Sequence, residues 1–313
     1  MILPTYNRAH LLPRALRSVL SQTYVDLEVR VVDDGSTDET PAVVAAYADP
    51  RVRYIRRPHQ GAAVARNEGI RLAAGEWIAL IDSDDEWMPD KLEKQMALAA
   101  TAPPDVGVIY CGGVIVDDTT QQTIGIRRPL AEGHGWVFDL LLETHWFPTI
   151  AVVARRRCFE TVGGFDEHLS FGEDREWLLR ASRHFQFIGI DEPLVRVHLH
   201  EGMRLTGNLA ARAAFVEVIL ERYAAELRSR PLVAARKYVG LGDLYLRGGD
   251  PRRARDVYGL ALRVRPSFAP AYFHLALSLG PWRAWHAVSR WRQHRRARSA
   301  VAAVRRPSDS MAH

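Results

Sequence analysis

The stretch Trp77-Ile78-Ala79-Leu80-Ile81-Asp82-Ser83-Asp84-Asp85 decides how the rest of this 313-residue chain is interpreted. An apolar run that suits a buried strand leads directly into three carboxylates. Asp82 and Asp84 are spaced i, i+2, so both side chains can turn toward one hard cation, and oxygen-only ligation suits Mg²⁺ or Mn²⁺. The alternative is a solvated acidic turn in which Asp85 caps the helix expected around residues 89–93.

Two periodicities alternate along the first 90 residues and predict an α/β fold. The pattern indicates strands at 27–32, 52–55 and 77–81, and helices at 8–22, 37–47 and 61–73. Strand–helix alternation with short connections favours a mostly parallel central sheet flanked by helices. Ligands of such sheets bind beyond the carboxyl ends of the strands.

Polar motifs follow the apolar start Met1-Ile2-Leu3 and two of these predicted strands. They are Pro4-Thr5-Tyr6-Asn7, Asp33-Asp34-Gly35-Ser36-Thr37-Asp38 and Asp82-Ser83-Asp84-Asp85. Each also has a structural interpretation. Asn7 is a suitable N-cap for the following helix, and an Asp-Gly pair favours a turn. The convergence of all three motifs at one edge of the sheet, rather than any one of them, predicts a ligand site.

The order of the motifs resembles the signature of family 2 glycosyltransferases, inverting enzymes with the GT-A nucleotide-diphospho-sugar transferase fold. The resemblance covers roughly residues 1–205. The chain departs from the family pattern in its first strand, which is shortened to Met1-Ile2-Leu3 before the first motif. We expect this shortening to reduce stability. Besides the three motifs above, the resemblance includes Ala65-Arg66-Asn67-Glu68-Gly69, Gly163-Gly164-Phe165-Asp166-Glu167 and Glu173-Asp174.

This resemblance implies a donor-nucleotide site. Tyr6 would stack on a pyrimidine ring whose N–H is accepted by Asp34, and Arg66, early in a helix, would favour phosphate. The alternative for Arg66 is an ordinary residue on a helix surface. The residues expected to bind the donor nucleotide are Pro4, Thr5, Tyr6, Asn7, Asp34, Arg66, Asp82 and Ser83.

The resemblance also implies metal and catalytic residues. Asp84 is the expected metal ligand, Asp82 reaches ribose or metal, and His200 binds the metal or diphosphate; a surface histidine is the alternative for His200. Asp174 is the expected general base that deprotonates the acceptor hydroxyl. Glu173 would orient the acceptor or support its loop.

These residues together imply a metal-dependent inverting glycosyltransferase that uses Mg²⁺ or Mn²⁺. Its partners would be a nucleotide-diphospho-sugar donor, expected to be UDP-linked, and a hydroxyl of a saccharide or lipid-linked acceptor, as in cell-surface polysaccharide or glycan synthesis. A non-catalytic, enzyme-like scaffold that recruits partners through a helical tail is the alternative. Nucleotidyl transfer is disfavoured because residues 1–20 contain no glycine for a phosphate loop.

The chain changes character after residue 208, so we predict a GT-A domain over 1–208 and an all-α extension over 209–280. Within the extension the spacing resembles about one and a half tetratricopeptide repeats, which we expect to pack on the catalytic domain because fewer than three repeats rarely stand alone. The pattern rests on Tyr238, Leu241, Gly242, Tyr245, Ala254, Tyr258, Ala261 and Pro266, and restarts at Tyr272 and Leu275.

Residues 281–313 form a basic tail rich in tryptophan and arginine. This tail carries +7, so the other 280 residues carry −2 of the net charge of +5. The composition predicts peripheral contact with an anionic membrane surface, with a disordered basic tail as the alternative. No nucleic-acid-binding fold is recognisable.

We expect a cytoplasmic protein, with the inner membrane surface as the site of any peripheral contact. The two cysteines, Cys111 and Cys158, fit a reducing compartment. The chain shows neither a signal peptide nor an apolar run of the ~18–20 residues that a membrane span needs.

Overall fold

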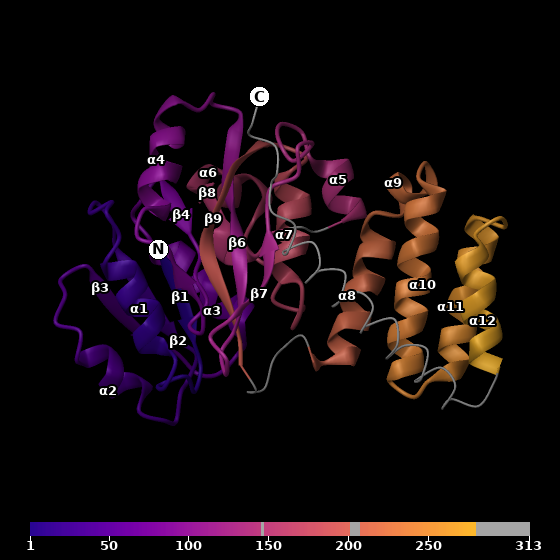
Figure 1. Ribbon diagram of the computed structural model, residues 1–313, viewed down its shortest axis with the longest axis horizontal. Helices are drawn as coiled ribbons and strands as arrows, with labels where there is room; N and C mark the ends of the chain where they lie inside the picture. The colour runs from indigo at the N-terminus through magenta and orange to yellow at the C-terminus, as the bar shows by residue number, and fades with distance from the viewer. Residues whose placement is uncertain (145–146, 201–206, 280–313) are drawn as a thin grey trace, which may run out of the picture. The chain divides into compact units, whose positions relative to one another are not determined.

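The structure is a computed structural model that describes residues 1–144, 147–200 and 207–279 (Figure 1). The chain divides into two compact units, Met1–Glu201 and Gly202–His313. The predicted basic tail at 281–313 lies outside the described residues, and the domain limits remain predictions. No helix among the described residues is long and apolar enough to cross a membrane.

The first unit begins with a parallel three-stranded sheet in the order β1-β2-β3. Its strands are Ile2–Thr5, Val29–Asp33 and Val52–Arg56, and they alternate with helices α1 (Leu12–Leu20), α2 (Thr40–Ala45) and α3 (Ala62–Leu72). The shortened first strand is fully paired, since its register with β2 runs from Ile2↔Arg30 to Thr5↔Asp33. The predicted α/β alternation of this part of the chain is confirmed.

The second half of the sheet is mixed rather than parallel. Its order is β4-β8-β6-β9-β5, with β7 paired to β6. β6 runs parallel to β9, whereas the β4–β8, β6–β8, β5–β9 and β6–β7 pairs are antiparallel. The strands are β4 Trp77–Ala79, β5 Glu86–Trp87, β6 Val106–Asp117, β7 Thr123–Arg127, β8 Val153–Arg155 and β9 Gln186–Leu199.

The two halves meet at the stretch that opens the sequence analysis. Leu80 forms a parallel bridge with Ile2, and the Ile81 N–H donates to the Ile2 carbonyl at 3.1 Å. The acidic residues therefore leave the sheet next to the carboxyl ends of β1 and β2. The remaining elements of this unit are α4 Lys91–Thr101, α5 Phe138–Glu143, the 3-10 turn η1 Thr149–Ala151, α6 Arg156–Val162 and α7 Glu173–Ala181.

Apolar packing explains why these elements meet. Leu3, Leu12, Leu16, Val31 and Ile81 belong to one buried cluster, so α1 covers the sheet close to the point where its halves join. The helices predicted at 8–22 and 37–47 are shorter than expected. The Arg8 carbonyl already accepts from Leu11 and Leu12 in a turn, and Asn7 has φ 51°, so regular helix begins only at Leu12.

The second unit, as far as it is described, is all helical. It contains α8 Leu209–Arg222, α9 Ala224–Arg228, α10 Pro231–Arg247, α11 Pro251–Val264 and α12 Ala269–Leu279, and Figure 1 shows α10, α11 and α12 side by side. Gly242 of α10 faces Tyr258 of α11, whose hydroxyl donates to Asp243 at 2.8 Å. The predicted helical extension is confirmed, and its assignment to tetratricopeptide repeats remains a prediction.

Alanine at Gly242 should destabilise the helical unit, because its Cβ would lie 2.3 Å from the Tyr258 ring. Overpacking of this kind costs about 1–3 kcal/mol. Gly240→Ala in the same helix is the matched control, since its Cβ would meet nothing within 4 Å. That exposed change should stabilise by about 0.5–1 kcal/mol. Urea unfolding followed by far-ultraviolet circular dichroism compares the two, and equal stability of both variants would contradict the close packing.

Candidate active site

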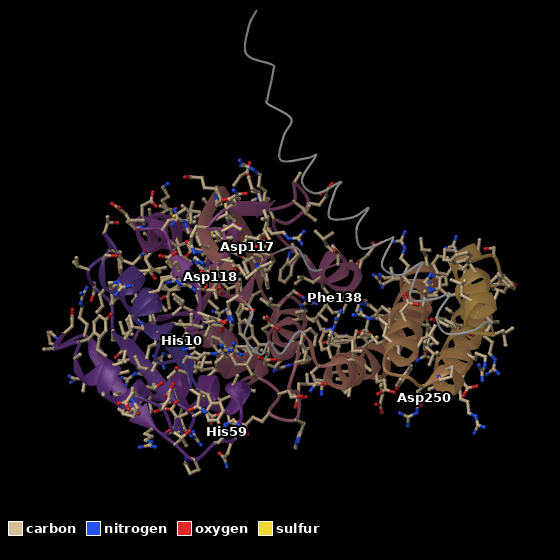
Figure 2. All side chains as sticks on the ribbon, turned by 60° about the horizontal axis from the view of Figure 1, so that its bottom comes forward. His10, His59, Asp117, Asp118, Phe138 and Asp250 are labelled. Carbon is tan, nitrogen blue, oxygen red and sulfur yellow. The ribbon has the colours of Figure 1, made fainter. Side chains whose placement is uncertain are left out.

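Asp34 and Tyr6 come together around a residue that the sequence analysis did not select, His59. The buried Asp34 carboxylate accepts the backbone N–H groups of Gln60 at 2.9 Å and Gly61 at 2.8 Å, and His59 Nδ1 lies 2.8 Å from its Oδ2. The Tyr6 ring stacks on the His59 imidazole with centroids 4.0 Å apart and planes 16° apart. The His59 imidazole, a nitrogen-bearing aromatic ring, thus contacts both Tyr6 and Asp34, the residues predicted to bind a pyrimidine (His59 is labelled in Figure 2).

Asn7 ties the loop after β1 to the loop after β2. Its Oδ1 accepts the Thr37 N–H at 2.8 Å, and its own N–H donates to the Ser36 hydroxyl at 2.9 Å. The interpretation of Asn7 as a helix cap is therefore wrong, because its side chain is committed to the neighbouring loop and α1 starts at Leu12. In the same region Pro4, Thr5 and Ser83 are buried, and Thr5 Oγ1 has no hydrogen-bond partner among the described residues.

Arg66 joins two carboxylates rather than pointing freely into the site. Its side chain, 8% exposed, donates from Nη2 to Asp82 Oδ1 at 2.7 Å and from Nη1 to Glu173. The alternative of a surface helix residue is thus wrong, and the phosphate role predicted for Arg66 has to coexist with this ion pair. Burial lowers the pKa of Arg66, but the two carboxylates raise it by more, so the guanidinium stays charged.

Glu173 and Asp174 open α7, as predicted, directly after Gly172 with φ 76°. Burial and the neighbouring Asp174 raise the pKa of Glu173, and Arg66 opposes that rise. Asp174 accepts the Arg175 N–H on Oδ1 at 2.8 Å and the hydroxyl of Thr149 on Oδ2. Two residues from opposite sides of the predicted site, Asp82 and Glu173, are therefore linked through one guanidinium, with Asp174 beside them.

Asp84 and His200 lie together although 116 residues separate them. His200 Nε2 lies 2.9 Å from Asp84 Oδ2, and the Asp84 side chain keeps a 25% exposed fraction. Across the described part of the chain, no group of three or more histidine, cysteine, aspartate or glutamate side chains is arranged to hold a metal ion. Among these residues Asp84 and His200 form a pair, and the metal role predicted for them remains a prediction.

Asp85 does not cap the following helix, which is a correction to the sequence analysis. The chain first enters β5, which pairs with β9, and this brings Asp85 Oδ1 to the His198 N–H at 2.8 Å. Helix α4 begins only at Lys91, with Asp90 before it. Burial, followed by the charges of Asp84 and Asp82, raises the pKa of the Asp85 carboxyl well above its usual range.

A partly buried network behind the acidic motif was also missed from the sequence. His198 Nε2 lies 2.8 Å from Glu86 and its Nδ1 lies 3.0 Å from Asp118. Arg14 donates to Asp118 at 2.6 Å and to the backbone carbonyl of Asp84 at 2.6 Å. Figure 2 shows Asp118 well apart from His59, so this network supports the opposite side of the site from the Tyr6 stack. Neither Arg14 nor Asp118 belongs to a sequence motif, so only the folded structure shows that they are part of this network.

Comparison with known proteins places this geometry in a family. The model of glycosyl transferase family 2 matches residues 1–171. The chain belongs to glycosyl transferase family 2. The succinoglycan biosynthesis protein ExoO of Rhizobium meliloti (strain 1021) is 34% identical over 239 residues, covering 72% of this chain and 68% of that protein. An uncharacterized glycosyltransferase of Rickettsia felis is 31% identical over 64% of this chain, which spans only 33% of that relative.

A further curated relative is similar in sequence, and two solved structures share the fold. The Escherichia coli glucosyltransferase WfgD, named for transfer from UDP-Glc to an α-D-GlcNAc-diphosphoundecaprenol acceptor, is 40% identical over 31% of this chain and 39% of its own length. TarS 1-349 of S. aureus, solved with UDP-GlcNAc, aligns with a TM-score of 0.61 at 16% identity over 88% of this chain and 89% of that one. The mannosyltransferase PcManGT of Pyrobaculum calidifontis, solved with GDP-Man and Mn²⁺, aligns at 0.55 and 23% identity over 91% and 81%.

These findings confirm the predicted family, the α/β GT-A fold and the assignment of the chain as a glycosyltransferase. The family motif around Arg66 has a further role that the sequence did not reveal. Asn67 accepts the Phe165 N–H at 2.8 Å and donates to the Phe165 carbonyl at 2.9 Å. Arg66 and Asn67 thus fix both the start of α7 and the Gly164–Glu167 loop before it.

Arg66→Gln should strongly destabilise this family 2 domain, because it leaves Asp82 and Glu173 without their counter-charge. Breaking a buried ion pair by removing one partner costs about 3–5 kcal/mol. The loss in free energy of unfolding relative to the wild type should become smaller as pH falls. Burial raises the pKa values of Asp82 and Glu173, so protonation then neutralises the two carboxylates that have lost their partner. Urea unfolding at several pH values measures it.

The control is Arg71→Gln in the same helix, where the arginine is largely exposed and pairs with Glu68. Its stability should change little, because exposed ion pairs contribute weakly. Equal losses in the two variants would contradict a special role for the buried Arg66 pair.

Proposed function

We propose that this protein is a metal-assisted inverting glycosyltransferase that moves a sugar from a nucleotide-diphospho-sugar to an acceptor hydroxyl. One observation carries the proposal: Arg66 binds both Asp82 and Glu173. Asp82 belongs to the same motif as the metal-binding candidate Asp84, and Glu173 directly precedes the candidate base Asp174. Direct displacement with inversion needs a base on the acceptor side and charge neutralisation on the donor side. Both kinds of group lie around this one ion pair.

The donor is proposed to be UDP-linked. A carboxylate accepts N–H groups, so Asp34 can accept the ring N–H of uracil while Tyr6 stacks on the base. The hydrogen bonds from Gln60 and Gly61 orient the carboxylate for this contact. The UDP-Glc named for WfgD and the UDP-GlcNAc bound to TarS support this donor class, whereas the GDP-Man bound to PcManGT is the main alternative.

Asp84, His200 and Asp82 are the residues that would hold a divalent cation. Carboxylate oxygens suit both Mg²⁺ and Mn²⁺. When bound, the cation would neutralise charge on the departing diphosphate, and at an effective dielectric of ~20 each pair of unit charges 4 Å apart contributes roughly 4 kcal/mol. Arg66 would add positive charge nearby while orienting Asp82.

Asp174 is proposed to take the proton from the acceptor hydroxyl as that oxygen attacks the anomeric carbon. An aspartate is a weak base in water, so the rate gain has to come from its position within ~3 Å of the hydroxyl. Glu173 is bound to Arg66 and therefore fixes the first turn of α7, which agrees with a supporting rather than a proton-transfer role.

The acceptor is proposed to be a saccharide or lipid-linked saccharide in the synthesis of a surface polysaccharide or glycan. The names of ExoO and WfgD, which refer to succinoglycan and to a diphosphoundecaprenol acceptor, support this class. We also propose a cytoplasmic location, with peripheral membrane contact through the basic tail. Both cysteines of the chain are free and buried, which fits a reducing compartment.

A non-catalytic scaffold is the competing function. Thermal unfolding with UDP, with and without Mn²⁺, separates the two: an enzyme should be stabilised by UDP in a Mn²⁺-dependent way, whereas a scaffold should not respond. A panel of nucleotide sugars assayed for Mn²⁺-dependent hydrolysis then identifies the donor.

Asp84→Ala should abolish turnover of that donor, with a fall of at least about 100-fold, because a ligand of the proposed cation is lost. Asp90→Ala is the matched control, since Asp90 is an exposed acid a few residues on that pairs with Lys94. Initial rates are measured over a range of Mn²⁺ concentrations. Wild-type rates in Asp84→Ala would refute the metal assignment.

Asp174→Asn should bind the donor normally but transfer sugar about 10²–10⁴-fold more slowly, as expected for loss of a general base. Donor affinity is measured by calorimetry, and transfer by product formation with an acceptor. Circular dichroism verifies the fold. Transfer at the wild-type rate would remove Asp174 from the mechanism.

A further inference from the structure

The candidate base has a partner outside every sequence motif. Thr149 is 9% exposed, and its hydroxyl donates to Oδ2 of Asp174. The other carboxylate oxygen accepts the backbone N–H of Arg175 at 2.8 Å. The carboxylate is therefore held at both oxygens, one by its own helix and one by a separate element, the η1 turn.

Buried side chains donate hydrogen bonds to the backbone carbonyls of the η1 turn. A three-residue 3-10 turn leaves backbone carbonyls without helical partners. Trp87 Nε1 donates to the Ile150 carbonyl at 2.9 Å, and Gln95 Nε2 donates to the Ala151 carbonyl at 2.9 Å. These donors come from β5 and α4, so the turn is attached to the strand that directly follows the acidic motif.

The two donors are oriented in turn by a buried lysine. Lys91 Nζ donates to Gln95 Oε1 at 2.7 Å and lies 3.8 Å from the centre of the Trp87 ring. Because the amide oxygen of Gln95 receives the ammonium group, its NH₂ group must face the carbonyls. Lys91 is fully buried, and this burial lowers the pKa of its ammonium group to about 8. This chain of polar groups in the core thus ends at backbone carbonyls of the turn that carries Thr149.

We infer that Thr149 is a positioning residue for the transfer reaction: its hydroxyl aims the Asp174 carboxylate at the acceptor, and Trp87 and Gln95 keep Thr149 in place. This inference rests on the proposed role of Asp174. A hydrogen-bond donor on Oδ2 restricts rotation of the Asp174 carboxylate. Because small misplacements of a catalytic group cost up to about 100-fold in rate, such a restraint affects kcat more than donor binding.

Thr149→Val tests the inference, since valine keeps the shape and removes the hydroxyl. We expect kcat to fall about 10- to 100-fold with the donor KM within about threefold of the wild type. Thr149→Ser, which retains the donor group, should recover most of that loss. Ile150→Val is the packing control in the same turn and should leave kcat nearly unchanged. Equal activity of the valine and serine variants at position 149, whether high or low, would overturn the inference.

A double-mutant cycle separates this inference from the proposed function. In the Asp174→Asn background, Thr149→Val should cause little further loss, because the group it positions is already inactive. An additive loss would overturn the positioning role. Full activity of Asp174→Asn alone would instead refute the proposed base.

Trp87→Phe provides a second variant should Thr149→Val fold poorly. It removes the indole N–H from the Ile150 carbonyl and keeps an aromatic ring at that position. We expect kcat to fall severalfold, again only where Asp174 is present. A loss of the same size in the Asp174→Asn background would count against the inference.

Discussion

The buried ion pair of Arg66 with Asp82 and Glu173 is the interaction on which the site depends. Arg66 and Glu173 are buried, whereas the Asp82 side chain keeps a 36% exposed fraction. Buried charges of this kind are tolerated only when each is paired and hydrogen-bonded. Asp82 belongs to the acidic motif beyond β4, and Glu173 begins α7, 107 residues from Arg66 along the chain. Because the guanidinium binds both segments, its geometry helps to set the distance between the proposed donor and acceptor sides of the site.

Helix α3 acts as the element that joins these sides. Gly69 lies against β1, where a Cβ would come within 2.5 Å of Ile2, so the helix can approach the sheet closely. Arg66 reaches the acidic motif and α7, and Asn67 binds the loop before α7 on both the N–H and the carbonyl of Phe165. One short helical motif thus fixes the sheet, the metal-binding candidates and the candidate base relative to one another.

Two further layers support the site from behind. On the side of the proposed nucleotide site, Asp34 anchors the loop before α3, and His59 lies against Tyr6. On the side of the acidic motif, Arg14 binds the Asp84 backbone and Asp118, which also contacts His198. These contacts hold the loops that carry Tyr6 and Asp84, two residues with proposed donor and metal roles.

The sequence by itself determined the α/β class, the family, and the residues at the strand ends, because alternating periodicity and ordered short motifs are local properties of the chain. It also placed Glu173 and Asp174 correctly at the start of a helix. It was wrong for the caps proposed at Asn7 and Asp85, since both side chains bind segments distant in sequence. A mixed second half of the sheet was likewise invisible, because strand direction depends on long-range pairing.

Only the tertiary structure decided which charges face one another. The pairing of Arg66 with Glu173, the approach of His200 to Asp84 and the contact of Thr149 with Asp174 join residues that are 107, 116 and 25 positions apart. No local spacing encodes these contacts. They form because burying a polar group costs free energy unless it has a hydrogen-bond or charge partner within the folded unit. The packing of helices on the sheet determines which partner lies within reach.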